Sequence, residues 1–302
     1  MDNLGKIPRT RKDKLFDFVN YGLLSIILVL ILYPLYLIVI SSFSDPIVVN
    51  AGKVWLWPKD FTLKGYEILL ENAEVWKGYV NSFLYTILSV LIGGSLVLTA
   101  GYALSRKDLV GRNFFMFMIV FTMFFSGGLI PSYLLVKDLQ MMNTIWAVII
   151  PSAVSAFHII VAKTFFQSTI PEELMEAAKM DGCSTTKFFF KIVVPLSTPI
   201  IAVIALFSAV SEWNSYFPAL IYLYDQALYP LQLILRSILI ASQDAAQVGD
   251  GAVDPEMIAE AQHYKELVKY SLIIVSSLPV LIIYPFLQRY FVKGVMIGSI
   301  KG

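Results

Sequence analysis

The sequence is poor in charge and in the residues that most catalytic and metal sites use. Only 15% of its 302 residues are charged, and it contains one cysteine and two histidines. A single cysteine, Cys183, excludes an intrachain disulfide, and His158 and His263 lie far apart without partner cysteines, which argues against a metal site. The motifs HExxH, GxSxG, GxGxxG and GxxxxGK[ST] are absent, so no protease site or phosphate-binding loop is indicated. Energy for any driven process would have to come from elsewhere.

Hydrophobic residues make up 57% of the chain, and they are concentrated in long runs. At about 1.5 Å of rise per residue, some 20 residues span the roughly 30 Å hydrocarbon layer. We therefore predict an all-α membrane protein with six transmembrane helices. The first run lacks a signal-peptide cleavage site and is expected to be retained. The runs cover residues 21–40, 79–104, 114–136, 145–162, 200–222 and 267–291, with Glu212 inside the fifth and Lys269 near the start of the sixth.

Basic residues are distributed unevenly between the runs. The tail to residue 20, the turn 105–112, the segment 163–197 and the end after residue 288 carry 15 Lys and Arg, against seven in the alternate segments. The positive-inside rule then places both termini in the cytoplasm. The net charge of +1 is thus the difference between a basic and an acidic side. We expect a tail 1–20, a six-helix domain 21–291 and a tail 292–302.

Small residues and prolines interrupt the apolar runs. The second run has a strip where another helix can approach closely. Pro34, Pro131 and Pro285 each remove a backbone hydrogen bond and predict either a kink beside a pathway or an ordinary bend in a helix bundle. The strip consists of Gly93, Gly94, Ser95, Thr99, Ala100 and Gly101.

The segment 168–199 has the pattern of two short helices joined by a glycine turn. Thr169 with Glu172 fits a capping box, Pro171 fits the first helical turn and Gly182 fits the position after the helix end. Ser184 or Thr185 then begins a second helix, which Pro195 and Pro199 end or bend. From pattern alone this is either an amphipathic helix on the membrane surface or a contact for a motor protein, with Ala177 and Ala178 as a small face.

The same segment resembles the EAA loop of permease subunits in binding-protein-dependent ABC importers. The matching residues are Glu176-Ala177-Ala178, then Gly182 after three residues, then Ile192-Val193-Val194-Pro195 after nine more. The family usually has leucine where Val194 stands, a mild apolar exchange. Asp181-Gly182-Cys183-Ser184, residues 195–199 and Trp213-Asn214 are similar to the carbohydrate branch, as in the second permease of maltose-type importers. Residues 127–131 with Asn143-Thr144 are similar to the complex-oligosaccharide subgroup.

This resemblance implies a type I importer permease that is not an enzyme and binds no cofactor. ATP and Mg²⁺ would be bound by two separate ATPase subunits. Further partners would be a second permease, an extracytoplasmic solute-binding protein, the lipid bilayer and a carbohydrate, with no nucleic acid. The expected location is the bacterial cytoplasmic membrane, with several passes. The EAA helix would dock in an ATPase cleft and convert its closure into helix rotation, and the implied contact residues are Glu176, Ala177, Ala178, Asp181, Gly182, Ile192 and Pro195.

Candidate substrate residues combine aromatic faces with polar groups, as sugar sites do. The fifth run offers Glu212, Trp213, Asn214, Tyr216 and Phe217, and the fourth offers Trp146, Phe157 and His158. Membrane aromatics also serve as packing residues or interfacial anchors. Glu212 is the stronger candidate, because an acid within the membrane usually faces a cavity or a partner; it would serve a sugar hydroxyl or pair with a basic residue of the other permease.

The segment 223–266 is large for an outer connection. Residues 229–241 are apolar around Arg236 and predict an interfacial or buried helix, and 255–266 predict a polar helix that runs into the sixth span. Each of these two segments is a candidate contact for the binding protein, or it only covers the outer surface and faces solvent. Two alternative functions remain: an importer for a non-sugar solute, or an intramembrane enzyme built on Glu212, His158 and Asp225.

Overall fold

The computed structural model describes residues 10–247 and 268–285, although not the side chains of 241–247. These described residues form helices and turns, with an isolated bridge between Ser44 and Phe61 in place of any sheet. The chain divides into two compact units, Met1–Glu71 with Ala241–Val275 and Asn72–Ile240 with Ser276–Gly302. The all-α prediction is confirmed within the described residues.

The first unit is built on one long helix. α1 (Arg11–Ser41) has 31 residues and begins with a complete capping box between Thr10 and Asp13. It contains the predicted run 21–40, and it continues through Pro34. A short α2 (Pro46–Asn50) follows, with the Asp45 side chain accepting from the backbone N–H of Ile47, and then α3 (Lys64–Glu71).

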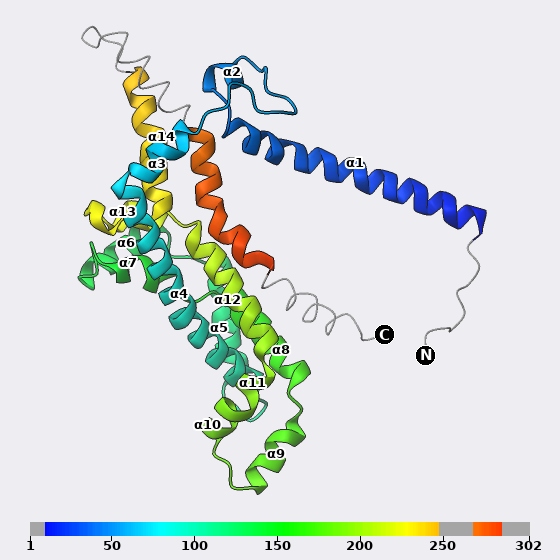
Figure 1. Cartoon of the computed structure of the whole chain (residues 1–302). Helices are drawn as coiled ribbons and strands as arrows, with labels where there is room; N and C mark the ends of the chain where they lie inside the picture. The colour runs from blue at the N-terminus through cyan, green and yellow to red at the C-terminus, as the bar shows by residue number, and fades with distance from the viewer. Residues whose placement is uncertain (1–9, 248–267, 286–302) are drawn as a thin grey trace. The chain divides into compact units, whose positions relative to one another are not determined.

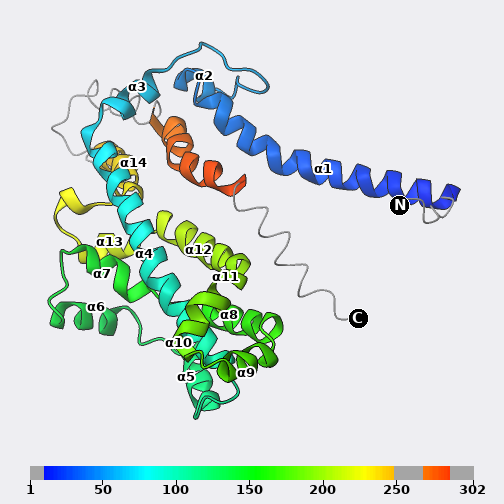
Figure 2. The same cartoon turned by 60° about the horizontal axis from the view of Figure 1, so that its bottom comes forward.

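The second unit is organised around α4 (Ala73–Ser105), a helix of 33 residues against which α8 (Ala156–Thr169) and α12 (Thr198–Trp213) pack (Figures 1 and 2). Two glycines allow the close approach. A Cβ on Gly93 would lie 2.1 Å from the carbonyl oxygen of Ala153, and one on Gly101 would lie 2.6 Å from Ala162 Cβ. A Cβ on Gly94 would meet no atom of another described segment within 4 Å. The predicted close approach of another helix is therefore confirmed at Gly101, whereas Gly93 is approached by the turn at Ala153 before α8.

The third run does not form a straight span. It divides into α5 (Arg112–Phe124) and α6 (Leu129–Asp138), whose axes differ by 115°. Phe125 leaves the helical conformation, and Gly128 has φ +84°, a region that favours glycine. The prediction of one helix over 114–136 is wrong because the glycine pair 127–128 reverses the chain inside the apolar run.

The fourth and fifth runs are also interrupted. α7 (Ile145–Ile149) and the 3₁₀ turn η1 (Ile150–Ser152) meet α8 at 51°. The fifth run consists of α12, a break at residues 214–216 and α13 (Phe217–Tyr222). Among the described residues, three helices, Arg11–Ser41, Ala73–Ser105 and Val268–Pro285, are long and apolar enough to cross a membrane by themselves. Up to six spans result if each of three bent pairs is one span.

The connection after the fifth run begins with the 3₁₀ turn η3 (Gln226–Leu228) and α14 (Leu231–Gln247). Leu231, Leu233, Ile234 and Leu235 are buried. The start of the helix predicted for 229–241 is thus buried, whereas residues 236–240 are half-buried or exposed, and both the buried and the interfacial interpretation remain open. The predicted helix at 255–266 and the tail 292–302 lie outside the described residues.

Candidate coupling site and transport pathway

The predicted EAA helix is α9 (Glu172–Met180). Pro171 is its N-cap in an extended conformation, and no side chain caps the first turn. The predicted capping box of Thr169 with Glu172 is wrong, since Thr169 is the last residue of α8. Pro171 still makes physical sense there, because a helix start has no use for the N–H that proline lacks. Glu172 and Glu173 in the first turn and Lys179 in the last complement the helix dipole.

Gly182 ends α9 in a Schellman motif, as predicted. Its N–H donates to the Lys179 carbonyl at 3.0 Å, and the N–H of Cys183 donates to the Ala178 carbonyl at 2.9 Å. Gly182 has φ +70°, which costs other residues roughly 1 to 2 kcal/mol. The sharp exit at this point directs the chain into the second helix.

The second helix changes character along its length. Ser184 caps α10 (Thr185–Phe188) by accepting from the N–H of Lys187. A π-helical turn, η2 (Phe189–Val193), and α11 (Val194–Leu196) follow, and the axis then turns by 79° into α12. Because Pro195 donates no N–H, the local ladder is disturbed, and the buried Ser197 hydroxyl donates to the Val193 carbonyl at 2.6 Å.

One side of α9 is buried and the other is free. Met175 and Ala178 are buried in an apolar cluster with Phe166, Phe188 and Phe189. Consecutive helical residues point about 100° apart, so Ala177 is exposed while Ala178 packs inward. Only one of the two alanines is thus available to a partner. Of the remaining EAA residues, Glu176, Asp181, Gly182 and Pro195 are exposed and Ile192 is half-buried.

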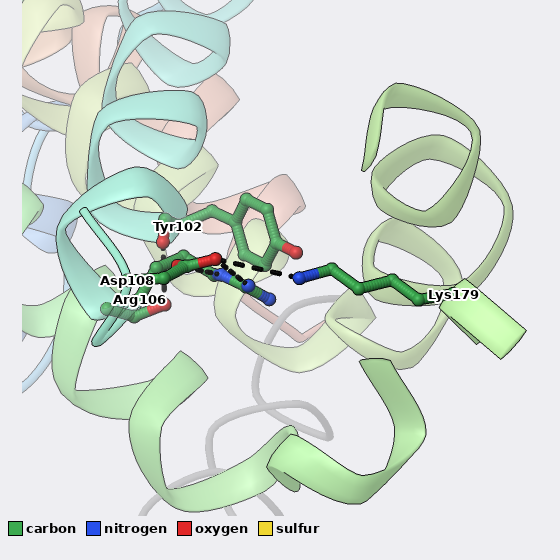
Figure 3. A network of polar contacts seen from close by, with 5 residues as sticks. Tyr102, Arg106, Asp108 and Lys179 are labelled. Atoms are coloured by element: carbon green, nitrogen blue, oxygen red, sulfur yellow. Dashed lines mark hydrogen bonds and ion pairs between the residues drawn. The ribbon is translucent and has the colours of Figure 1, made fainter. Parts of the chain in front are cut away.

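Ion pairs join α9 to the turn that follows α4. Asp108 accepts from Arg106 Nε at 3.0 Å and from Arg106 Nη2 at 2.6 Å, and Lys179 Nζ lies 3.8 Å from the same carboxylate (Figure 3). Lys107 Nζ lies 3.0 Å from Glu172 Oε1. Hydrogen bonding from Arg106, followed by its charge and that of Lys179, holds the pKa of Asp108 below its ordinary value. We call Arg106, Lys107 and Asp108 with their partners on α9 the α4–α9 clamp.

A cavity of about 480 Å³ lies beside the clamp. Tyr102, Arg106, Glu173 and Glu176 are among its lining residues, which come from the ends of α4 and α8, the turn and α9. The turn and α9 therefore do not pack tightly over their full length, and long charged side chains make part of their contact. The apolar anchor of α9 is instead its contact with Phe166 and Phe188.

The fifth-run candidates Glu212 and Trp213 both face α4. Glu212 is half-buried and its carboxyl group interacts with Ser89, near Tyr85. Trp213 is buried, its Nε1 donates to the Ser276 carbonyl at 3.0 Å, and its ring lies 5.0 Å from that of Phe83. This environment makes Trp213 a packing residue in the described conformation and leaves Glu212 as the polar group between α12 and α4.

The other candidates do not converge on one point. Asn214 is exposed, and its Nδ2 donates to the Val210 carbonyl of its own helix at 2.8 Å. Tyr216 lies under the Arg236 guanidinium at 5.2 Å. His158 stacks on Phe207 with centroids 5.9 Å apart, and Trp146, Phe157 and Phe217 are exposed. Their role in a sugar path stays a prediction.

Polar residues of α4 form a set that the sequence reasoning missed. Asn81 Nδ2 donates to the carbonyls of Ala227 and Tyr229, Tyr85 donates to the Leu228 carbonyl at 2.6 Å, and Ser82 accepts from the N–H of Leu231 at 2.8 Å. A Cβ on Gly78 would lie 2.6 Å from Ile234 Cδ1. No local pattern signals these pairings, because the partners are some 150 residues apart.

Asn143 stabilises the connection between two segments. In the sequence it is notable only for its similarity to the complex-oligosaccharide subgroup. It adopts φ +57°, its N–H donates to the Tyr222 carbonyl at 2.8 Å, and its Oδ1 accepts from the N–H groups of Tyr224 and Asp225. Asparagine tolerates the left-handed conformation better than most residues. It joins the α6–α7 connection to the end of α13. In the described part of the chain, no group of three or more His, Cys, Asp or Glu is placed to hold a metal ion.

Comparison with known proteins agrees with this architecture. Residues 97–297 match the family described as binding-protein-dependent transport system inner membrane component. The polygalacturonan/rhamnogalacturonan transport system permease protein YtcP of Bacillus subtilis (strain 168) is 40% identical, over 96% of this chain and all of that protein. The arabinooligosaccharides transport system permease protein AraQ of Halalkalibacterium halodurans is 28% identical, over 89% and 91%.

A solved structure extends the likeness to three dimensions. It is the crystal structure of a bacterial ABC transporter involved in the import of the acidic polysaccharide alginate, which matches with a TM-score of 0.82 and 33% identity over 95% of this chain and all of that chain. The chain therefore belongs to the family of inner membrane components of binding-protein-dependent transport systems.

Proposed function

We propose that this chain forms half of the translocation pathway of an ATP-driven importer for oligosaccharides, with α9 as its coupling helix. The observation that carries the coupling role is the geometry of α9: one side is fixed in the core of its own unit, and Ala177 on the opposite side is exposed. A helix that is rigidly held on one side transmits a push on the other as a rigid body.

The path of that motion follows the packing. Met175 and Ala178 share one apolar cluster with Val97 of α4, Ile159 of α8 and Ile204 of α12. Displacement of α9 by closure of an ATPase dimer would therefore move these three helices together. ATP binding would favour one of two membrane states by differential contact, as alternating access requires.

The assembly follows from the family. We propose a second permease subunit, two ATPase subunits that bind ATP and Mg²⁺, and an extracytoplasmic solute-binding protein. The chain would cross the bacterial cytoplasmic membrane several times with both termini inside, as the distribution of basic residues favours. No catalytic residue is assigned to this chain.

The coupling role is tested by adding bulk to the free face of α9. Ala177→Trp is expected to leave assembly detectable and to abolish binding-protein-stimulated ATPase activity and uptake, because Ala177 is exposed and the new ring meets only the partner. Leu139→Trp is the matched control, since Leu139 is 60% exposed at the end of α6. Unchanged stimulation and uptake in Ala177→Trp would contradict the docking of α9.

The substrate class rests on the relatives' names and on the alginate importer. Two of these proteins are named for polysaccharides that contain uronic acids, so we propose acidic oligosaccharides as the first substrates to test. The binding protein encoded with this permease should co-purify with such a sugar, identified by mass spectrometry. Co-purification with an amino acid, a peptide or a metal ion would refute the carbohydrate assignment without affecting the coupling helix.

A further inference from the structure

The connection between α2 and α3 contains an exposed apolar segment. Residues 54–58 read Val-Trp-Leu-Trp-Pro, with Lys53 before them and Lys59 after them. Val54 is buried, whereas Trp55, Leu56 and Trp57 are 68%, 63% and 77% exposed. Three adjacent large apolar side chains at this exposure are costly in water. Tryptophan is also the residue most typical of the membrane–water interface, and lysine stems reach from there to the headgroups.

The segment returns alongside the membrane helix α1. Tyr33 of α1 donates to the Trp55 carbonyl at 3.5 Å, and Tyr36 donates to the Leu56 carbonyl. Both views show the loop after α2 beside the C-terminal end of α1 (Figures 1 and 2). Tyr33 is eight positions before Ser41, the end of α1, which corresponds to about 12 Å of helix. The segment thus lies level with residues inside the apolar run 21–40.

Both ends of the loop are fixed. Lys53 donates its N–H to the Val48 carbonyl at 3.1 Å. Lys59 donates its N–H to Ser44 Oγ at 3.2 Å, and Thr62 donates to the Phe43 carbonyl at 3.1 Å. These contacts hold Lys59 at Ser44, three residues past the end of α1, and Lys53 against α2, whereas the carbonyls of Trp55 and Leu56 reach Tyr33 and Tyr36 within α1. The loop therefore has a defined depth relative to the helix.

Irregular backbone at membrane depth needs internal hydrogen-bond partners, because lipid provides none. The tyrosine hydroxyls satisfy the carbonyls of Trp55 and Leu56, and the Trp55 Nε1 donates to the Gly52 carbonyl at 2.7 Å. Two carbonyls and one indole N–H of the loop tip are in this way bonded within the chain, while its apolar side chains are exposed. In a loop surrounded by water, the solvent would satisfy these groups without internal hydrogen bonds.

We infer that residues 54–58 form a lipid anchor that inserts into the outer leaflet beside α1, with Trp55, Leu56 and Trp57 in contact with the acyl-chain boundary. The inference rests on the membrane placement of α1 and is independent of the coupling role of α9. Its failure would leave the function proposed for α9 untouched.

The test measures the surroundings of the loop in the assembled transporter in a lipid bilayer. Trp57→Cys, made with Cys183→Ser and cysteine-free partner subunits, carries a nitroxide label whose collisions with oxygen and with a water-soluble nickel chelate are recorded. We expect strong oxygen and weak nickel collisions at 57, and the reverse at the control Asn50→Cys, which is exposed at the end of α2. Strong nickel collisions at 57 would overturn the proposal in favour of water, and weak collisions with both reagents would overturn it in favour of a protein partner.

A second pair of variants tests the hydroxyl contacts. Tyr33→Phe with Tyr36→Phe should shift the label at 57 toward nickel accessibility, because the two carbonyls then seek water. Tyr21→Phe is the matched control on the same helix, twelve positions before Tyr33, and should leave the ratio of collisions unchanged. An unchanged ratio in the double variant would contradict the role of the tyrosines in holding the loop at depth.

Discussion

The two ends of α4 are connected to their neighbours by different kinds of interaction. Near Ser105 the α4–α9 clamp joins α4 to α9 by ion pairs between side chains that are largely exposed. Near Gly78 the same helix binds residues 227–231 through side-chain hydrogen bonds to backbone groups, some of them buried. We call the latter the hydrogen-bonded end.

This difference separates a fixed end from an adjustable one. Buried hydrogen bonds to backbone groups are expensive to leave unmade, about 1 to 3 kcal/mol each, so the hydrogen-bonded end keeps one geometry. Exposed ion pairs contribute about 0 to 1 kcal/mol and can exchange partners with water. In the coupling proposed above, α9 moves together with its apolar cluster, and the weak charged contacts of the clamp can exchange partners without opposing that movement.

The largest loss of stability is expected in the middle of α4, between these two ends. Gly93→Val should prevent stable folding, at a cost of about 3 kcal/mol or more, because the new Cβ would lie 2.1 Å from the Ala153 carbonyl oxygen. Gly94→Val is the matched control, because its new Cβ would meet no atom of another described segment within 4 Å. Thermal unfolding of the purified assembly in detergent measures both, and equal stability of the two variants would contradict the close contact between α4 and the turn at Ala153.

A smaller loss is expected at Asn143. Asn143→Ala removes the acceptor for the N–H groups of Tyr224 and Asp225 and adds strain at φ +57°. The expected cost is about 2 kcal/mol. Asn143→Asp keeps an acceptor at the same position and should lose much less. If both variants unfold at the same temperature, the side-chain hydrogen bonds do not stabilise this connection.

These variants also mark where sequence reasoning succeeds. The glycine turn at 182, the cap at Ser184 and the helix of the EAA motif follow from local chemistry, because each depends on residues within a turn of one another. The reversal at Gly128 and the pairing of Asn81 with Ala227 and Tyr229 depend on contacts between distant segments. Apolar runs in the sequence indicate which residues lie away from water. They do not predict where a run bends, and they do not predict that Ala178 is buried while Ala177 is exposed.

At the clamp, a charge exchange should affect coupling more than stability. Lys107→Glu or Glu172→Lys alone places like charges at a separation of about 3.0 Å and should shift α9, lowering binding-protein-stimulated ATPase activity. Global stability should fall by less than about 1 kcal/mol, because both side chains are more than half exposed. The double variant restores the pair and should restore the stimulation. If the double variant loses as much stimulated ATPase activity as the two single variants lose together, the pair does not position α9.

The smallest effect is the pH dependence of Asp108. Its pKa is held below 3.8 in the folded protein, mainly by hydrogen bonding from Arg106. A depressed pKa adds stability above the unfolded-state value, and that contribution disappears as the pH falls through the folded-state value. The clamp should therefore be unchanged between about pH 8 and pH 5 and should weaken only below about pH 4. Asp108→Asn removes this dependence, whereas the hydrogen-bonded end carries no charge in its contacts and should show none.

The size of this pH effect is small. Because the Asp108 side chain is 60% exposed, the lost stability is a fraction of 1 kcal/mol. Raised salt should reduce the difference between wild type and Asp108→Asn further. A loss of stimulated ATPase activity that begins near pH 6 in wild type but not in Asp108→Asn would contradict this prediction, because it would show that the pKa of Asp108 is raised and not lowered.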